Sequence, residues 1–390
     1  MDCVQELYAD KDLSLLKKLT LVIPTHNRNF YLSRCLWYHA HFPFAEIIVA
    51  DSSIEEKRIV NRETVNKIRE AFDTKITYLE YDFPAEKYGG EIYRKWGDAV
   101  QQVKTEYSQS CTDKEFLIPT TVCNCIIFLD EHQDYSIAEG MDYTIQYSHK
   151  NTLAFYPWQG TNSYINEDAI ERIYDSLSDI RPVGTQFSVH RSKHHKKIFE
   201  NITKYNLYDL RFGEANIELS PLVFGKTCKL HTSGNIRDTT FFKTQSIVSK
   251  VNISESSCKR YPIIPDYPNH RYEEMFRNLQ SSLTSELPLS YYLTDTNMNK
   301  ETDKIINIFL SKRYHYKLGL LNKHKKTQIL VQRTWDALPM SFQEMIRTVL
   351  GEQIITQSPK PEKIVTDEIK CIEQLILANR SKYDLDTPII

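Results

Sequence analysis

The sequence has little of what would place a chain in a specialised class. Only 11 of its 390 residues are glycine, and no apolar run approaches the roughly 20 residues needed to span a bilayer. Eight cysteines in so long a chain have neither the density nor the spacing of a disulfide scaffold. The first six residues lack the basic and then apolar regions of a secretion signal. We therefore expect a cytoplasmic protein whose membrane contact, if any, is peripheral at the inner face.

A large charge of one sign is also missing. Lys and Arg total 49 and Asp and Glu total 51, so no bulk positive field marks a nucleic-acid-binding protein, and we expect no nucleic-acid partner. Positive charge is concentrated locally in two runs, residues 190–197 and 323–326. The first run could meet an anionic acceptor or a membrane surface. A solvated helix end is the favoured interpretation of both.

What the sequence does contain predicts an α/β protein. Hydrophobic residues make up 41% of the chain, enough for a sizeable core, and the length predicts two domains. The apolar runs 19–23, 46–50 and 75–80 are strand-like and are separated by helix-length segments. This order implies a parallel sheet built from βαβ units. Ligands of such sheets bind at the carboxyl ends of the strands, which here are the polar or glycine-bearing residues 25–28, 51–53 and 81–90.

Further elements follow along the chain. Asn29 is a candidate cap of the first helix. Helices are predicted over residues 55–72, 91–104, 120–131, 166–177 and 208–224, and extended segments over 106–111, 142–147, 153–158, 184–189 and 229–236, with 142–158 forming a hairpin. Beyond residue 250 the pattern is helical, at 273–283, 300–321, 342–350 and 368–379. We divide the chain into a nucleotide-binding and catalytic unit, 1–250, and a mainly helical region, 251–390.

Two short segments carry a family resemblance. Residues 22–28 read Val-Ile-Pro-Thr-His-Asn-Arg, and residues 49–53 read Val-Ala-Asp-Ser-Ser. In this order the chain resembles the family 2 glycosyltransferases of GT-A fold, whose Rossmann-like, mixed and mainly parallel sheet is flanked by helices. The resemblance covers about residues 18–240 and implies that Asp51 hydrogen-bonds the base of a nucleotide. The other nucleotide-binding residues that it implies are Pro24, Thr25, Asn27, Arg28 and Ser52. A helix cap is the alternative role for Asp51.

The metal-binding element of that family has an imperfect counterpart here. Members carry an Asp-x-Asp stretch after the fourth strand, which holds Mg²⁺ or Mn²⁺ against the diphosphate. The corresponding residues are Asp113, Lys114 and Glu115. Two carboxylates at i and i+2 supply oxygen ligands for a hard divalent cation. The resemblance therefore implies a site of Asp113 and Glu115, with Asp113 also near the donor and His231 as a further ligand. Lys114 could instead neutralise the diphosphate directly, and a solvated acidic loop is the bland alternative.

The remaining candidate residues lie on two predicted helices. By resemblance, Arg94 or Lys95 would lie near the diphosphate and Asp98 beside the nucleotide, against the alternative of an exposed basic helical turn. An inverting transferase also needs a carboxylate that accepts the proton of the attacking hydroxyl. Glu214 is the predicted base, and Glu218, one helical turn further on, is the second candidate. A solvated helix face is the alternative for both.

These features predict transfer of a sugar from a nucleotide diphosphate donor, with UDP as the expected nucleotide, to a hydroxyl of a saccharide or lipid-linked saccharide. Two alternatives stay open. A sugar nucleotidyltransferase would need a glycine-rich signature after the first strand, and residues 24–28 contain no glycine. A non-catalytic sugar-binding or nucleotide-binding scaffold of the same fold would explain the altered acidic element. The C-terminal region is the predicted site of acceptor, membrane or homo-oligomer contacts.

Overall fold

The structure is a computed structural model of the chain. It describes residues 2–83, 89–147, 153–157, 162–179, 185–238, 269–287, 295–314, 367–372 and 374. The predicted helix 342–350 and the basic run 323–326 lie outside these residues. The described strands form one nine-stranded sheet with the order β3-β2-β1-β4-β8-β6-β9-β5, and β7 pairs with β6.

The first half of the sheet is parallel and matches the predicted βαβ order. Its strands are β1 (Leu19–Thr25), β2 (Glu46–Asp51), β3 (Ile76–Glu80) and β4 (Tyr107–Ser110), and its helices are α2 (Asn29–His39), α3 (Glu55–Ala71) and α4 (Glu91–Gln101). Thr25 pairs with Asp51, and Asp51 pairs with Glu80. The carboxyl ends of β1, β2 and β3 therefore lie level at one edge.

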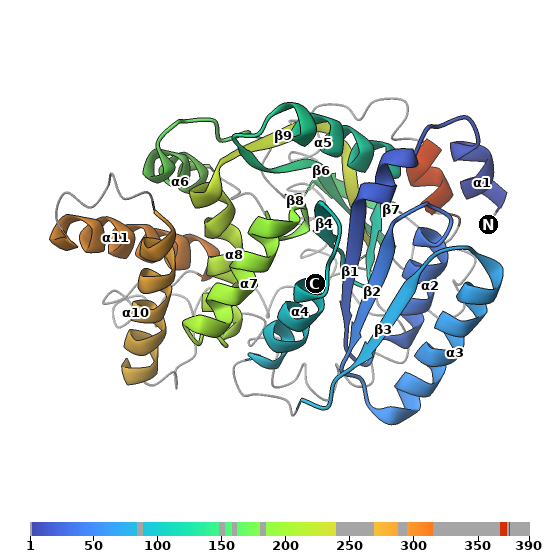
Figure 1. Cartoon of the computed structure of the whole chain (residues 1–390), viewed down its shortest axis with the longest axis horizontal. Helices are drawn as coiled ribbons and strands as arrows, with labels where there is room; N and C mark the ends of the chain where they lie inside the picture. Colours follow the sequence, from blue (N-terminus) through green and yellow to red (C-terminus); the bar gives the residue numbers. More distant parts are fainter. Residues whose placement is uncertain are drawn as a thin grey trace, which may run out of the picture.

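Helices cover both faces of this parallel half. Leu21 and Ile23 of β1 belong to a core cluster with residues of α2 and α3, whereas Val22 belongs to a second cluster with residues of α4. Successive side chains of a strand point to opposite faces, so both faces are buried and the strand is apolar throughout. Figure 1 shows α2 and α3 on one side of the sheet and α4 on the other.

The second half of the sheet is mixed. β8 (Val189–Arg191) runs antiparallel to β4 and to β6 (Tyr135–Tyr147), and β9 (Lys226–Asp238) runs parallel to β6 and antiparallel to β5 (Glu115–Leu117). The predicted hairpin is confirmed, because β6 pairs with β7 (Leu153–Pro157) in antiparallel register. Helices α5 (Pro119–Glu131), α6 (Ala169–Ser178), α7 (Ser192–Lys204) and α8 (Leu210–Phe224) complete this half. The predicted mixed α/β sheet flanked by helices is confirmed.

Two local predictions are wrong, and a short helix was missed. The segment 184–189 is a 3-10 turn, Thr185–Phe187, followed by β8, rather than one strand. Asn29 is the first residue of α2 and not its cap, because Arg28 occupies the cap position without a side-chain hydrogen bond. A short helix, α1 (Asp2–Tyr8), was not predicted.

The basic run 190–197 is only partly solvated. His190, Arg191 and His195 are buried. Arg191 lies on β8, inside the sheet, and its guanidinium donates to the carbonyl oxygens of Leu129, His132 and Tyr135. The interpretation of the whole run as a solvated helix end is therefore wrong for these three residues, since the strand order places them against the core.

The C-terminal region is helical where it is described. α10 (Asn269–Glu286) and α11 (Asp295–Tyr314) lie beside α8 in Figure 1, and residues 367–372 are helical as well. Met275 and Leu279 of α10 belong to the same core cluster as Phe212 of α8. The helices thus pack on the first unit, while the predicted boundary at residue 250 lies outside the described chain.

Two further expectations concern membranes and cysteines. Among the helices that the structure describes, none is long and apolar enough to cross a bilayer. Cys35, Cys111, Cys123, Cys125 and Cys228 are free thiols. Cys371, by contrast, is disulfide-bonded.

The closest backbone packing in the sheet joins Gly140 of β6 to Gly234 of β9. A Cβ at position 140 would lie 2.6 Å from the Gly234 Cα, where only backbone movement could relieve the clash. We expect Gly140→Ala to lower the free energy of unfolding by about 2 kcal/mol, measured by urea denaturation. Gly97→Ala is the control, because its Cβ would meet the movable Phe199 ring at 3.2 Å in a helix that favours alanine. Equal stabilities of the two variants would contradict this packing argument.

Candidate active site

A cavity of about 380 Å³ opens at the carboxyl ends of β1, β2 and β4. The sequence predicted a ligand at the first two of these ends, whereas the third predicted end, that of β3, carries Tyr81 and Phe83, which line a separate groove. The predicted residues that line it are Pro24, Thr25, Arg28, Ser52, Lys95, Asp113 and Glu214. Lining residues that were not predicted as site residues are His26, Glu91, Ile92, Tyr93, Trp96, Thr112, Gln186, Phe187, Leu210 and Arg237. The structure therefore brings seven predicted residues together around one cavity.

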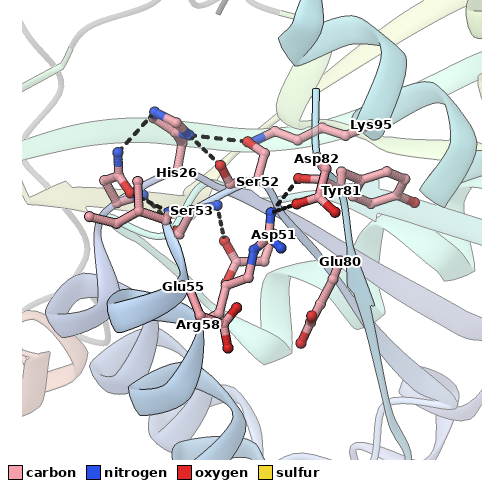
Figure 2. Close-up of polar contacts among 12 residues, drawn as sticks. His26, Asp51, Ser52, Ser53, Glu55, Arg58, Glu80, Tyr81, Asp82 and Lys95 are labelled. Atoms are coloured by element: carbon pink, nitrogen blue, oxygen red, sulfur yellow. Dashed lines mark hydrogen bonds and ion pairs between the residues drawn. The ribbon is translucent and has the colours of Figure 1, made fainter. Parts of the chain in front are cut away.

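Asn27 fixes the loop at the mouth of this cavity. Its φ is +54°, in the left-handed region that asparagine tolerates better than most residues. Its N–H donates to Ser53 Oγ at 2.7 Å, and its Oδ1 accepts the Ile54 N–H at 2.9 Å. Figure 2 shows the neighbouring His26 pointing to Ser52, whose carbonyl oxygen lies 2.8 Å from His26 Nδ1. Asn27 thus joins the loops after β1 and β2, and it does not line the cavity.

Asp51 is fully buried below that loop. Its carboxylate accepts hydrogen bonds from the Ser53 N–H at 2.7 Å, Asn61 Nδ2 at 2.6 Å and the Tyr78 hydroxyl at 2.5 Å. Burial, followed by the hydrogen bond to Asp51, raises the pKa of Tyr78 above its usual range. Asp51 does not line the cavity, so its contact with a base stays a prediction. In this structure it holds the end of β2 against α3 and β3.

Arg58 secures the neighbouring end of β3. Its guanidinium donates to the Tyr81 carbonyl oxygen and pairs with Asp82, each at 2.6 Å, as Figure 2 shows. Asp51 and Arg58 thus fix the carboxyl ends of β2 and β3. The loop that carries Ser52 therefore starts from a strand end that is held in place.

Lys95 is the buried cation of the cavity. Its Nζ donates to the Thr25 carbonyl oxygen at 2.5 Å. It also donates to Ser52 Oγ at 2.7 Å, and Figure 2 shows Lys95 beside Ser52. Burial lowers the pKa of Lys95 to about 8, although the charges of Asp51 and Asp113 oppose this shift. The alternative of an exposed basic turn is therefore wrong for Lys95.

Arg94 and Asp98 lie on the other side of α4, because successive helical residues are turned by about 100°. The Arg94 guanidinium lies 3.7 Å from the centroid of the Tyr208 ring. Asp98 accepts the Tyr81 hydroxyl at 2.6 Å. Both residues line a separate groove between α4 and α7 and not the cavity. The structure thus selects Lys95, rather than Arg94, as the basic residue of α4 at the candidate site.

The acidic element is paired within the protein. Asp113 accepts the Thr25 hydroxyl at 2.7 Å and the Arg28 guanidinium at 3.3 Å. Glu115 is opposite Arg237 in the β5–β9 register and accepts its Nε at 2.7 Å. Glu115 does not line the cavity. Lys114 does not line it either, since its ammonium lies 4.5 Å from the centroid of the Tyr31 ring.

The predicted metal ligands do not form one group. His231 is exposed on β9 and lines a different depression, with Asn124 and Glu131 of α5. Among the described residues, the one cluster of three or more His, Cys, Asp or Glu side chains with ligand spacing is Cys35, His39 and Cys111, and all three are buried. The residues Asp113, Glu115 and His231 as arranged do not fit a divalent cation.

Helix α8 positions Glu214. Asp209 caps the helix by accepting the Arg211 N–H at 3.1 Å. The Tyr93 hydroxyl donates to the Leu210 carbonyl oxygen at 2.6 Å, which ties α4 to the first turn. Glu214 lines the cavity, whereas the buried Glu218 accepts the Thr185 N–H at 3.0 Å. The structure therefore places Glu214, and not Glu218, where an acceptor could meet it.

Comparisons with known proteins find matches to the structure but none to the sequence. No protein-family model matches the chain, and no curated protein matches its sequence. Among solved structures, S. aureus TarS matches with 12% identity and a TM-score of 0.40, over 75% of this chain and 55% of that chain. TarS 1–349 with UDP-GlcNAc matches with 12% identity and a TM-score of 0.39, over 76% and 91%. TarS 1–349 with UDP matches with 12% identity and a TM-score of 0.40, over 76% of this chain and 92% of that chain.

This chain thus spans about half the length of the longer TarS chain.

Proposed function

We propose that the chain is a glycosyltransferase that uses a nucleotide diphosphate sugar, UDP-linked by preference. One observation carries the proposal. At the carboxyl ends of β1, β2 and β4, the basic side chains of Arg28, Lys95 and Arg237 line the same cavity as the carboxylate of Glu214. A diphosphate leaving group requires the first feature, and deprotonation of an acceptor hydroxyl requires the second.

The proposed reaction is a direct displacement. The acceptor oxygen forms a bond with the anomeric carbon as the bond from that carbon to the phosphate oxygen breaks. The bonding pair leaves on the diphosphate, beside the cations, and the acceptor proton passes to the Glu214 carboxylate. Attack from the face opposite the leaving group inverts the configuration. Because Asp113 and Glu115 do not fit a divalent cation, no step depends on one.

The predicted acceptor is a hydroxyl of a saccharide or lipid-linked saccharide. The groove between α4 and α7, which has a volume of about 730 Å³ and is lined by Tyr81, Phe83 and Tyr208, lies outside the cavity. It would hold sugar rings of the acceptor that are remote from the reacting hydroxyl. A peripheral membrane contact and homo-oligomer contacts through the C-terminal region remain part of the proposal.

The function is tested with a panel of nucleotide sugars. Hydrolysis of a donor, or transfer from it to added saccharides, supports the proposal. If one or more donors bind but none is hydrolysed or transferred, the chain is the non-catalytic scaffold of the alternative interpretation. If no nucleoside diphosphate or nucleotide sugar binds, the proposed donor class is wrong.

Nucleotide affinity is expected to fall as the pH rises above about 8. The pKa of Lys95 in the folded protein is lowered to about 8 by burial, so this side chain loses its charge above that pH, while a diphosphate stays ionised. The Arg28 guanidinium beside it stays charged over this range, because the charge of Asp113 raises its pKa. We expect the Kd for UDP to rise by up to about tenfold per pH unit, measured by calorimetry at pH 7 and pH 9.5. The Lys95→Met variant should bind UDP weakly, with a Kd that hardly changes between pH 7 and pH 9.5. A wild-type Kd that does not change with pH would contradict the role of Lys95.

A further inference from the structure

Every carboxylate oxygen of the acidic element already accepts a hydrogen bond. In Asp113, Oδ2 accepts from the Thr25 hydroxyl and Oδ1 accepts from Arg28. In Glu115, Oε2 accepts the Thr112 N–H at 2.7 Å, and Oε1 accepts from both Nε and Nη2 of Arg237. The guanidinium groups of Arg28 and Arg237 are therefore bonded to the carboxylate oxygens that a divalent cation would need as its charged ligands.

A cation could not enter without breaking these pairs. The side chains of Asp113 and Glu115 are 1% and 0% exposed, so both carboxylates are closed to solvent. Mg²⁺ and Mn²⁺ require about six ligands, chiefly oxygen atoms, in near-octahedral geometry. If a cation displaced Arg237, the guanidinium would lose its carboxylate partner, Glu115. Losing such a partner costs free energy when the charge is largely buried. The acidic element is thus already neutralised by the protein's own cations.

The same cations keep donors for an anionic ligand. The Arg28 side chain is 43% exposed, and of its five N–H donors one, on Nη1, binds Asp113. The Lys95 ammonium has three N–H donors and uses two of them on Thr25 and Ser52. Guanidinium groups bind phosphate oxygens through two parallel hydrogen bonds, whereas an ammonium acts as a point charge. Because Arg28 already pairs with Asp113, these two cations and that carboxylate leave about one net positive charge for a diphosphate.

We propose that this chain binds the diphosphate of its donor without a divalent cation, and that Arg28 and Lys95, supported by Arg237, supply the positive charge. The inference rests on the proposed function, since it concerns the same cavity and donor. In this arrangement Asp113 holds Arg28 in place and does not ligate a metal. Negative charge that develops on the leaving diphosphate is met by Lys95, which Thr25 and Ser52 hold in place, and by Arg28, which Asp113 holds in place.

The test compares UDP binding by the full chain with and without divalent cations. The protein is freed of metal with EDTA, and its Kd for UDP is measured by calorimetry in EDTA and again in millimolar Mn²⁺ or Mg²⁺. We expect the Kd values to agree within about twofold. A loss of affinity of about tenfold or more in EDTA, restored by the cation, would overturn the inference while leaving the proposed function intact. Absence of UDP binding under all conditions would overturn both.

Asp113→Asn separates the two accounts a second time. Asparagine keeps an oxygen that can accept from Thr25, and it removes the negative charge that competes with a phosphate for Arg28. We expect UDP to bind about threefold more tightly to this variant, with or without a cation. If Asp113 ligated a metal, the substitution would weaken binding and abolish any dependence on Mn²⁺. Thermal unfolding of the variant shows whether it retains the wild-type fold.

Discussion

Replacement of Glu214 by glutamine is expected to lower sugar transfer by about 10³-fold and to change the Kd for the nucleotide by less than about threefold. Glutamine keeps the size of the side chain but cannot accept the proton of the acceptor hydroxyl. Because Glu214 comes from α8, whereas the proposed diphosphate contacts are Lys95 of α4 and Arg28, its loss should spare the diphosphate site. Steady-state transfer and equilibrium binding, measured on the same preparation, separate the two effects.

Glu91→Gln is the matched control for this experiment. Glu91 is another carboxylate that lines the cavity, at the first turn of α4. We expect its replacement to reduce transfer by less than about tenfold. If Glu91→Gln abolished transfer and Glu214→Gln did not, Glu91 would be the base, and the assignment of Glu214 would be wrong.

Lys95→Met is expected to weaken nucleoside diphosphate binding by about 100-fold, close to 3 kcal/mol. Methionine retains most of the apolar stem and removes the ammonium that joins Thr25, Ser52 and the proposed phosphate. Equilibrium titration with UDP measures the loss. Since a buried charge is removed together with its hydrogen bonds, the free energy of unfolding should change by only about 1 kcal/mol.

Lys67→Met provides the control for Lys95→Met. Lys67 is an exposed lysine of α3 that does not line the cavity, so its replacement makes the same chemical change without touching the site. We expect UDP to bind this variant as it binds the wild type. If Lys95→Met bound UDP equally well, the diphosphate would not lie beside Lys95.

The parallel half of the fold could be predicted because its signals are local. The β-branched runs that became β1 and β2 are contiguous, and the polar residues after them, Thr25, Arg28 and Ser52, lie where parallel strands place their carboxyl ends. Asp51 shows the limit of this reasoning. Its position in the sequence is the same whether it faces a ligand or the core, and the hydrogen bonds from Asn61 and Tyr78 turn it inward.

Whether Arg94 or Lys95 lines the cavity depends on how α4 is rotated about its own axis. The pattern of α4 indicates an amphipathic helix, but which of two adjacent basic residues faces the sheet follows only from how the helix packs. Trp96 and Ala99, one and four positions after Lys95, are buried with it, whereas Arg94 stacks on Tyr208. The apolar Ala99 one helical turn after Lys95, against the acidic Asp98 one turn after Arg94, was the available signal that Lys95 points inward.

The pairing of Glu115 with Arg237 could not be predicted, because 122 residues separate the partners and antiparallel β5–β9 pairing brings them together. Nothing local in residues 113–115 reveals that an arginine from the last strand neutralises Glu115. The same holds for Phe187, which reaches the cavity from a 3-10 turn and packs against Arg237, 5.0 Å from the ring centroid to its guanidinium carbon. Non-local strand order, rather than the spacing of the carboxylates, decides which residues are available at the site.

The most direct test of the nucleotide-binding cavity is a crystal structure of the chain with UDP bound. We predict that the diphosphate lies at the carboxyl ends of β1 and β2, within hydrogen-bonding distance of Lys95 Nζ and the Arg28 guanidinium, with Glu214 facing the space beyond the terminal phosphate. A diphosphate bound elsewhere, or bound in this cavity without contact to Lys95 or Arg28, would contradict the proposal.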